Sequence, residues 1–212
     1  MIDLKLTALM SSKLCHDIIG PVGAVNNGIE LLQDESNADM RDQAVALISQ
    51  SAGEAAARLQ FYRLAFGLAS GMGADVSLRD ARTLCRSHMS FGKVELDWPD
   101  DAGGAENMSK DGIKVLCNLA TISASALPRG GKLTISGNVS EDGWDFEFHA
   151  NGPRAGLRED VMKTLLEGYD EDQLTAQNVG AQYLMAICAN NNFDISISKM
   201  EEDLTVISAK ST

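Results

Sequence analysis

Apolar residues in the first third of the chain recur at spacings of three and four, the repeat of an amphipathic helix. The pattern predicts a first helix from about Leu4 to Leu32, which the turn and capping residues DESNAD (34–39) then end. A second helix is predicted from about Ala38 to Leu68. Two long helices joined by a short loop form an αα-hairpin. Because one hairpin cannot cover both sides of so long a seam, we expect it to pair with a second copy into a four-helix bundle.

The pattern changes after the small, glycine-rich segment ASGMGAD (69–75), which is typical of a linker. Beyond it, strands are predicted at 76–78, 93–98, 132–139, 144–150, 194–199 and 204–209, and helices at 77–90, 109–127, 157–168 and 179–191. This order predicts an α/β sandwich with helices on one face of a mixed sheet. The chain is therefore expected to be an α+β protein, with a helical-hairpin domain at 1–70 and a sandwich domain at 76–212.

Composition and charge exclude several classes of function. The formal net charge of −12 argues against nucleic acid and anionic membrane surfaces as partners, because both are bound by basic patches. No apolar stretch approaches the roughly 18 residues of a membrane span. The segment around Asp3 lacks the apolar block of a signal peptide, so a cytoplasmic location is expected. The four cysteines are scattered and form no CxxC or Cys/His cluster, so no metal site is expected.

The segment LCHDIIGPVGAVNNGIELL (14–32) places a histidine opposite the apolar face of the first helix. At about 100° per residue, the apolar side chains of this segment fall within a stripe of about 80°. That stripe consists of Leu14, Ile18, Val22, Val25, Ile29 and Leu32. His16 lies at about 200° from the first of these, and Gly20, Gly23 and Asn27 lie between about 180° and 240°. We therefore expect an open face around the histidine, on which another protein could dock.

Three residues near this histidine are unfavourable in a regular helix. Gly20 and Gly23 each cost roughly 1 kcal/mol relative to alanine, so either a partner's backbone approaches them closely or they pack against another helix. Pro21 has no amide hydrogen for the carbonyl of Asp17, four residues back, which costs roughly 3 kcal/mol unless something compensates. The bend that a proline causes is local to the turn that holds His16.

His16 and Asp17 together suit phosphoryl transfer. A neutral imidazole nitrogen can accept a phosphoryl group near pH 7, and an adjacent carboxylate can hold the proton on the other ring nitrogen. Lys13, about one turn earlier, could steer a phosphate or a partner protein, or could be an ordinary solvated lysine. The pattern alone also leaves open that His16 is a solvated surface histidine beside an aspartate.

The same segment resembles the phosphoacceptor box of dimeric histidine kinases, in which an acidic residue follows the His and a Pro stands five positions after it. Here these are His16, Asp17 and Pro21. The amino-acid sequence of this segment resembles the ChpT-type histidine phosphotransferases of bacterial phosphorelays more closely still. The resemblance extends over three further segments, RLQFYRLAFG (58–67), ISASALPRGGKLTI (122–135) and ANGPRAGLR (150–158).

The resemblance implies a homodimeric four-helix bundle that carries a degenerate histidine-kinase-ATPase-like sandwich. It also implies that His16 accepts a phosphoryl group from the receiver domain of a hybrid histidine kinase and passes it to CtrA-like and CpdR-like response regulators. No cofactor is implied for the chain itself, because the receiver domain supplies Mg²⁺. By this resemblance, Asp17 assists the acceptor, and the docking or supporting residues are Lys13, Gly20, Pro21, Gly23 and Asn27.

Three positions indicate that the implied nucleotide site is degenerate. A kinase of this superfamily has a helix of the form NLxxNAxxxxP, and Ile122 stands where its magnesium-binding Asn belongs. At the end of a strand, Ala150 stands where such a kinase has the Asp whose carboxylate binds the adenine amino group. Of the GxGxG-type segment that cradles phosphate at a helix start, Gly180 alone remains in QNVGAQYL.

Two other hypotheses compete with a phosphate carrier. An ATP-dependent histidine kinase would need the contacts to metal, base and phosphate that these positions lack. A dimeric scaffold or regulator that binds receivers would not need a nucleophile at His16. The other two histidines, His88 and His149, match no catalytic pattern and are expected to be structural or solvated. The two tryptophans, Trp98 and Trp144, are expected in the core or at strand ends.

Overall fold

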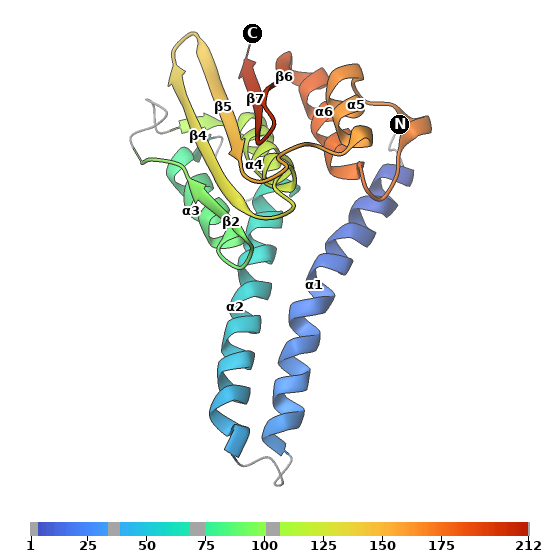
Figure 1. Cartoon of the computed structure of the whole chain (residues 1–212). Helices are drawn as coiled ribbons and strands as arrows, with labels where there is room; N and C mark the ends of the chain where they lie inside the picture. The colour runs from blue at the N-terminus through green and yellow to red at the C-terminus, as the bar shows by residue number, and fades with distance from the viewer. Residues whose placement is uncertain (1–3, 34–38, 68–74, 101–106, 212) are drawn as a thin grey trace.

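The computed structural model describes residues 4–33, 39–67, 75–100 and 107–211. Helices α1 (Leu4–Gln33) and α2 (Arg41–Ala65) lie side by side as the expected hairpin (Figure 1). The predicted start of α2 at Ala38 and its predicted end at Leu68 both lie outside the described residues, as does the predicted linker apart from Asp75. The helix ends at Ala65, and its C-cap residue Phe66 packs its ring on Tyr183, with 5.4 Å between the ring centroids.

The face of α1 that packs on α2 differs from the predicted apolar stripe. Gly28 is buried against α2, where a Cβ atom would lie 2.6 Å from Cγ1 of Ile48. Two members of the stripe, Val22 and Ile29, stay 45% and 41% exposed. The two helices therefore come together at a glycine. In this orientation of α1, part of the predicted apolar stripe points away from α2.

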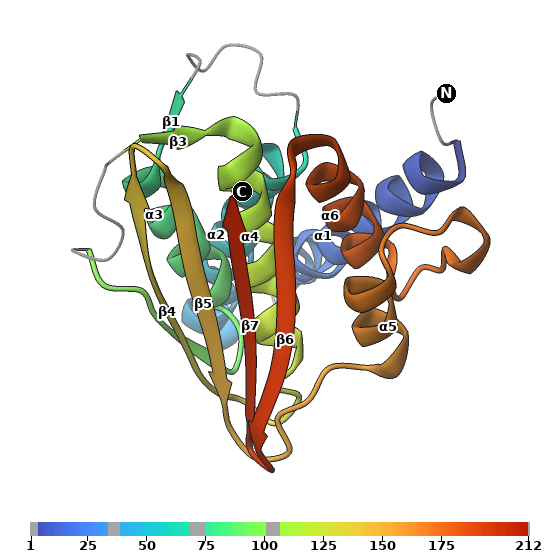
Figure 2. The same ribbon diagram turned by 90° about the horizontal axis from the view of Figure 1, so that it is seen from above.

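The second part of the chain is an α/β sandwich (Figure 2). Its helical elements are α3 (Leu78–Met89), α4 (Lys110–Ser125), α5 (Glu159–Glu167), the 3₁₀ turn η2 (Glu171–Gln173) and α6 (Val179–Asn191). Its strands are β1 (Asp75–Ser77), β2 (Val94–Asp97), β3 (Asn107–Ser109), β4 (Gly131–Ser140), β5 (Gly143–Asn151), β6 (Phe193–Glu201) and β7 (Leu204–Ser211). The short strand β3, which pairs with β1, was not predicted.

Five strands form one mixed sheet in the order β2-β4-β5-β7-β6. Strand β2 runs parallel to β4, and the other neighbours are antiparallel. Helices α3, α4 and α6 lie on one face of this sheet (Figure 2). The predicted α+β class, with a helical hairpin followed by a sandwich that has its helices on one face, is confirmed. Within the described part of the chain, no helix is both long and apolar enough to cross a membrane.

Local sequence explains the main elements of the sandwich. Ser77 and Ser109 cap α3 and α4, since their hydroxyls accept the backbone N–H groups of Arg79 and Gly112 at 3.1 Å. Every second residue of β5 from Trp144 to Ala150 is buried, as expected for a strand with one face on the core. Both tryptophans are buried, which confirms their prediction as core residues.

The sandwich is anchored on both helices of the hairpin (Figure 1). The end of α2 enters the main core through Phe61, and the buried Asn118 amide on α4 donates to the carbonyl of Ala65 at 3.1 Å. Near the start of α1, Met10 packs with Leu174 and Val179, which lie before and within α6. At the end of α3, His88 lines the same cavity as Asp17, the neighbour of His16 on α1.

Candidate functional site

His16 projects from the middle of α1 into solvent. Its side chain is 87% exposed, and its Nδ1 lies 3.4 Å from Oδ1 of Asp17. Gly20 and Asn27 are also exposed and Gly23 is partly exposed, so the predicted open face is present. A Cβ atom added at Gly20 or Gly23 would meet nothing within 4 Å. The two glycines are therefore not needed for packing against another helix of the same chain.

Asp17 is held by three side chains. Its Oδ2 accepts from the Lys13 ammonium at 3.0 Å and from the Tyr62 hydroxyl at 2.8 Å, while Oδ1 faces His16. Partial burial raises the pKa of this carboxyl, but the hydrogen bond and charge of Lys13 and the bonds from Tyr62 and His16 outweigh it and hold the pKa below 3.8. Lys13 is thus ion-paired with Asp17, and its docking or supporting role stays a prediction.

Pro21 is buried in α1, and its effect on the helix is compensated from α2. Proline cannot donate to the carbonyl of Asp17, and Nη1 of Arg58 donates to that oxygen instead. Nη2 of Arg58 donates to Glu54, four residues earlier on α2. The backbone group left without a helical partner is therefore satisfied by the neighbouring helix.

Sequence reasoning missed Arg58 and Tyr62 as parts of this site. Both stand in the segment RLQFYRLAFG, but a partner 41 or 45 residues away cannot be read from a helical pattern. Their spacing was an available signal, because residues four apart lie on one face of a helix. Pro21 was a second signal, since it predicts an unpaired carbonyl that needs a donor.

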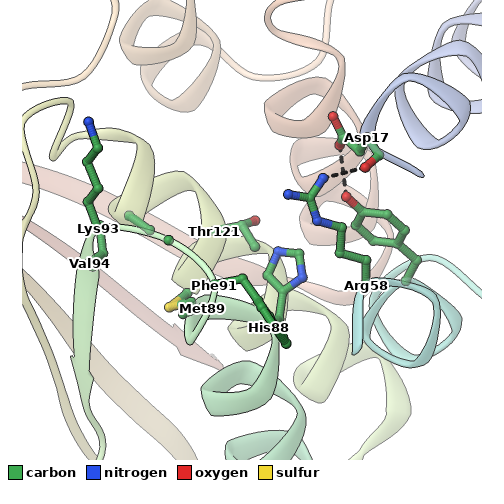
Figure 3. Close-up of a pocket in the computed structure, with 11 residues that line it drawn as sticks. Asp17, Arg58, His88, Met89, Phe91, Lys93, Val94 and Thr121 are labelled. Carbon is green, nitrogen blue, oxygen red and sulfur yellow. Dashed lines mark hydrogen bonds between the residues drawn. The ribbon is translucent and has the colours of Figure 1, made fainter. Parts of the chain in front are cut away.

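A cavity of about 300 Å³ lies beside Asp17, between the hairpin and the sandwich (Figure 3). Its wall combines Asp17, Arg58 and Tyr62 of the hairpin with residues around the end of α3 and on α4, among them His88 and Thr121. The His88 ring stacks on Phe61 with 4.2 Å between centroids. Burial and the nearby Arg58 charge lower the pKa of His88 to about 4, so it is neutral at pH 7. Its half-buried, stacked ring agrees with the structural role expected for it.

Two of the three positions that the resemblance assigns to a nucleotide site are part of the core. Ile122 on α4 and Ala150 on β5 are buried in the main apolar cluster. Gly180 lies in the first turn of α6, and a Cβ atom there would meet nothing within 4 Å. No group of three or more His, Cys, Asp or Glu side chains suited to a metal ion occurs among the residues that the structure describes.

Comparison with known proteins gives the family. Residues 78–203 match the family model of the histidine phosphotransferase C-terminal domain. The chain is 35% identical over 201 residues to the protein phosphotransferase ChpT of Brucella abortus (strain 2308), covering 95% of this chain and 93% of the relative. A solved structure described as a bacterial phosphotransferase superposes with a TM-score of 0.84 at 32% identity, covering 99% of this chain and 97% of the other. The chain therefore belongs to the family of ChpT-type histidine phosphotransferases.

Proposed function

We propose that this protein carries a phosphoryl group on His16, accepting it from one receiver domain of a two-component system and passing it to another. The observation that carries the proposal is the imidazole of His16, which is 87% exposed on an open helical face while its Nδ1 faces a carboxylate. Membership of the histidine phosphotransferase family supports the same activity.

The geometry suits a direct transfer. A carboxylate only accepts hydrogen bonds, so Asp17 favours the imidazole with its hydrogen on Nδ1 and its lone pair on Nε2. In the proposed step this lone pair attacks the phosphorus of an aspartyl phosphate on the receiver. An N–P bond forms as the P–O bond breaks, and the receiver's aspartate leaves as a carboxylate. The positive charge of the phosphorylated ring is stabilised by Asp17, and transfer to the second receiver reverses these bonds.

The receiver, which supplies Mg²⁺, provides most of the electrostatic stabilisation in this proposal. Gly20 and Gly23 leave room above the helix for its active site, and Asn27 extends the same open face. We propose that the donor is the receiver of a hybrid histidine kinase and that the acceptors are CtrA-like and CpdR-like response regulators in the cytoplasm. The division into a phosphotransfer domain at 1–70 and a degenerate ATPase-like domain at 76–212 is part of the same proposal.

We further propose that the chain neither binds ATP nor phosphorylates itself. The buried Ile122 and Ala150 offer no ligand to magnesium and no acceptor to an adenine amino group. Radiolabelled ATP and Mg²⁺ should therefore leave the purified protein unlabelled, and ATP should not raise its melting temperature. Label on His16 from ATP alone would instead identify a histidine kinase.

The decisive experiment starts from a purified receiver domain that carries radiolabelled aspartyl phosphate. Mixed with this protein, the receiver should lose label to His16, and a second receiver added later should gain it. The His16→Ala variant should still bind receivers but should relay no label, whereas the control variant His149→Ala should behave like the wild type. Relay that persists in the His16→Ala variant would favour a scaffold that brings receivers together without carrying phosphate.

A further inference from the structure

Two side chains of α2 reach across the hairpin to Asp17 (Figure 3). The Tyr62 hydroxyl donates to Oδ2 of Asp17 at 2.8 Å, and Nη1 of Arg58 donates to the backbone carbonyl of the same residue. Arg58 is held in turn by Glu54. One residue beside the phosphoacceptor is thus fixed at both its side chain and its backbone from the opposite helix.

The direction of the Tyr62 hydroxyl is set by aromatic packing. The Tyr62 ring lies 5.9 Å from Phe61, 5.7 Å from Phe66 and 5.7 Å from His88 of the sandwich, measured between ring centroids. A tyrosine has few rotatable bonds, so a packed ring presents its hydroxyl at little entropic cost. Lys13 alone would hold the carboxylate less firmly, because water screens an exposed lysine–carboxylate pair and Lys13 is 39% exposed.

The orientation of Asp17 decides which nitrogen of His16 carries the hydrogen. With Oδ2 occupied by Tyr62 and Lys13, Oδ1 is the oxygen that faces Nδ1 of His16, at 3.4 Å. A carboxylate at this place stabilises the Nδ1–H tautomer and leaves the lone pair on the outward-facing nitrogen. If Asp17 turned away, the imidazole would return to the tautomer mixture of a solvated histidine.

We propose that Tyr62 and Arg58 are positioning residues for the phosphoacceptor, which select the Nδ1–H tautomer of His16 by fixing Asp17. Neither residue touches the reacting atoms. The expected effect on transfer rate rests on the proposed function of His16, whereas the effect on the tautomer is a property of the isolated protein. Because the Tyr62 ring packs on His88, the sandwich contributes indirectly to the geometry of the acceptor.

The test compares the full-length wild type with Tyr62→Phe, which removes the hydroxyl and keeps the ring. Nitrogen NMR of the neutral imidazole reports its tautomer. Transfer from a radiolabelled phosphorylated receiver reports its rate. Tyr183→Phe is the matched control, since Tyr183 is also a packed tyrosine but takes no part in the hydrogen bonds around Asp17.

We expect Tyr62→Phe to shift His16 toward the Nε2–H tautomer and to slow transfer by roughly tenfold, the equivalent of one hydrogen bond. Tyr183→Phe should change neither quantity. If Tyr62→Phe does not fold, Arg58→Lys replaces it, because lysine keeps the charge but lacks the planar guanidinium whose two Nη atoms bond Asp17 and Glu54. An unchanged tautomer in a folded variant would overturn the proposal. A wild type that takes no label on His16 would refute the proposed function instead, and the NMR result would still decide the positioning role.

Discussion

The guanidinium of Arg58 donates to the backbone carbonyl of Asp17, which is the carbonyl that Pro21 cannot bond. An interruption in α1 is thereby converted into a link between α1 and α2 at the turn that carries His16. The proline and the arginine are 37 positions apart in the sequence, yet the arginine supplies the donor that the proline lacks.

This link predicts that Pro21 and Arg58 are energetically coupled. Replacing Arg58 by Met should lower the free energy of unfolding by about 1–3 kcal/mol, because it leaves a partly buried carbonyl without a donor. In a Pro21→Ala background, residue 21 regains an N–H group for the Asp17 carbonyl, and the same replacement should cost at least about 1 kcal/mol less. Urea unfolding of the two single variants and the double variant measures this difference. Costs that simply add would show that the two residues act independently.

The contact between Gly28 and Ile48 predicts opposite effects of two glycine replacements on α1. Alanine at Gly28 would place its Cβ 2.6 Å from Ile48 Cγ1 and 3.2 Å from the carbonyl of Ala44, so the helices must separate, at a cost of about 1–3 kcal/mol. Alanine at Gly20 meets nothing within 4 Å and should stabilise the protein by about 1 kcal/mol, the difference in helix propensity.

Thermal unfolding of Gly28→Ala and Gly20→Ala tests this pair directly. If Gly20 is kept open for a docked receiver, the stabilised Gly20→Ala variant should also accept phosphate more slowly than the wild type. An increase in both stability and transfer rate would show that the bare helix surface at Gly20 serves no docking role.

Much of the fold follows from sequence periodicity, but the packed face of α1 does not. A helical wheel ranks positions by hydrophobicity and therefore selects Val22 and Ile29, both of which remain exposed in the protomer. The two helices come close together at Gly28, which has no side chain to contribute to such a pattern. Strand β3 was missed for a related reason, because three residues are too few to show a period of two.

The candidate site was predictable in part. The exposure of His16 follows from its position opposite the apolar stripe, and the unpaired carbonyl of Asp17 follows from Pro21. The identity of the groups that complete the site does not, because Arg58 and Tyr62 are brought to Asp17 only by the packing of α2 on α1. A sequence can thus predict that a donor is required without predicting which residue supplies it.

His88 predicts a loss of stability in mild acid. Its pKa is lowered from 6.5 to about 4 in the folded protein by burial and by the positive charges of Arg58 and Lys13, against a smaller opposing effect of Asp17. Between these two values the unfolded chain binds a proton that the folded protein does not, so the free energy of unfolding falls as the pH falls. Above about pH 6.5, His88 is neutral in both states and the free energy of unfolding is not lowered. Below about pH 4 the decrease is complete, and it amounts to about 3 kcal/mol.

The His88→Phe variant isolates this contribution, because phenylalanine can keep the stacking on Phe61. Urea unfolding between pH 4 and pH 7 should show a flatter pH dependence for this variant than for the wild type. His149→Gln serves as the control for the loss of a histidine, since His149 lies on β5, outside the cavity that His88 lines. Equal slopes in His88→Phe and the wild type would show that His88 is not the group that titrates.

The exposed apolar side chains of the hairpin predict a homodimer. Ile19, Val22 and Ile29 on α1 and Val45 and Leu59 on α2 are between 41% and 72% exposed. Apolar side chains spaced in this way along both helices would complete a four-helix bundle if a second copy packed on them.

In a two-fold dimer each substitution occurs twice, so Val45→Glu should raise the dissociation constant of the dimer by more than about tenfold. Leu166→Glu, at a residue that is 63% exposed on α5, is the matched control and should leave the dimer intact. Sedimentation of the three proteins measures the outcome, and circular dichroism checks that each remains folded. A wild type that sediments as a monomer would rule out the dimer. The exposed apolar side chains of the two helices would then be available to a different partner.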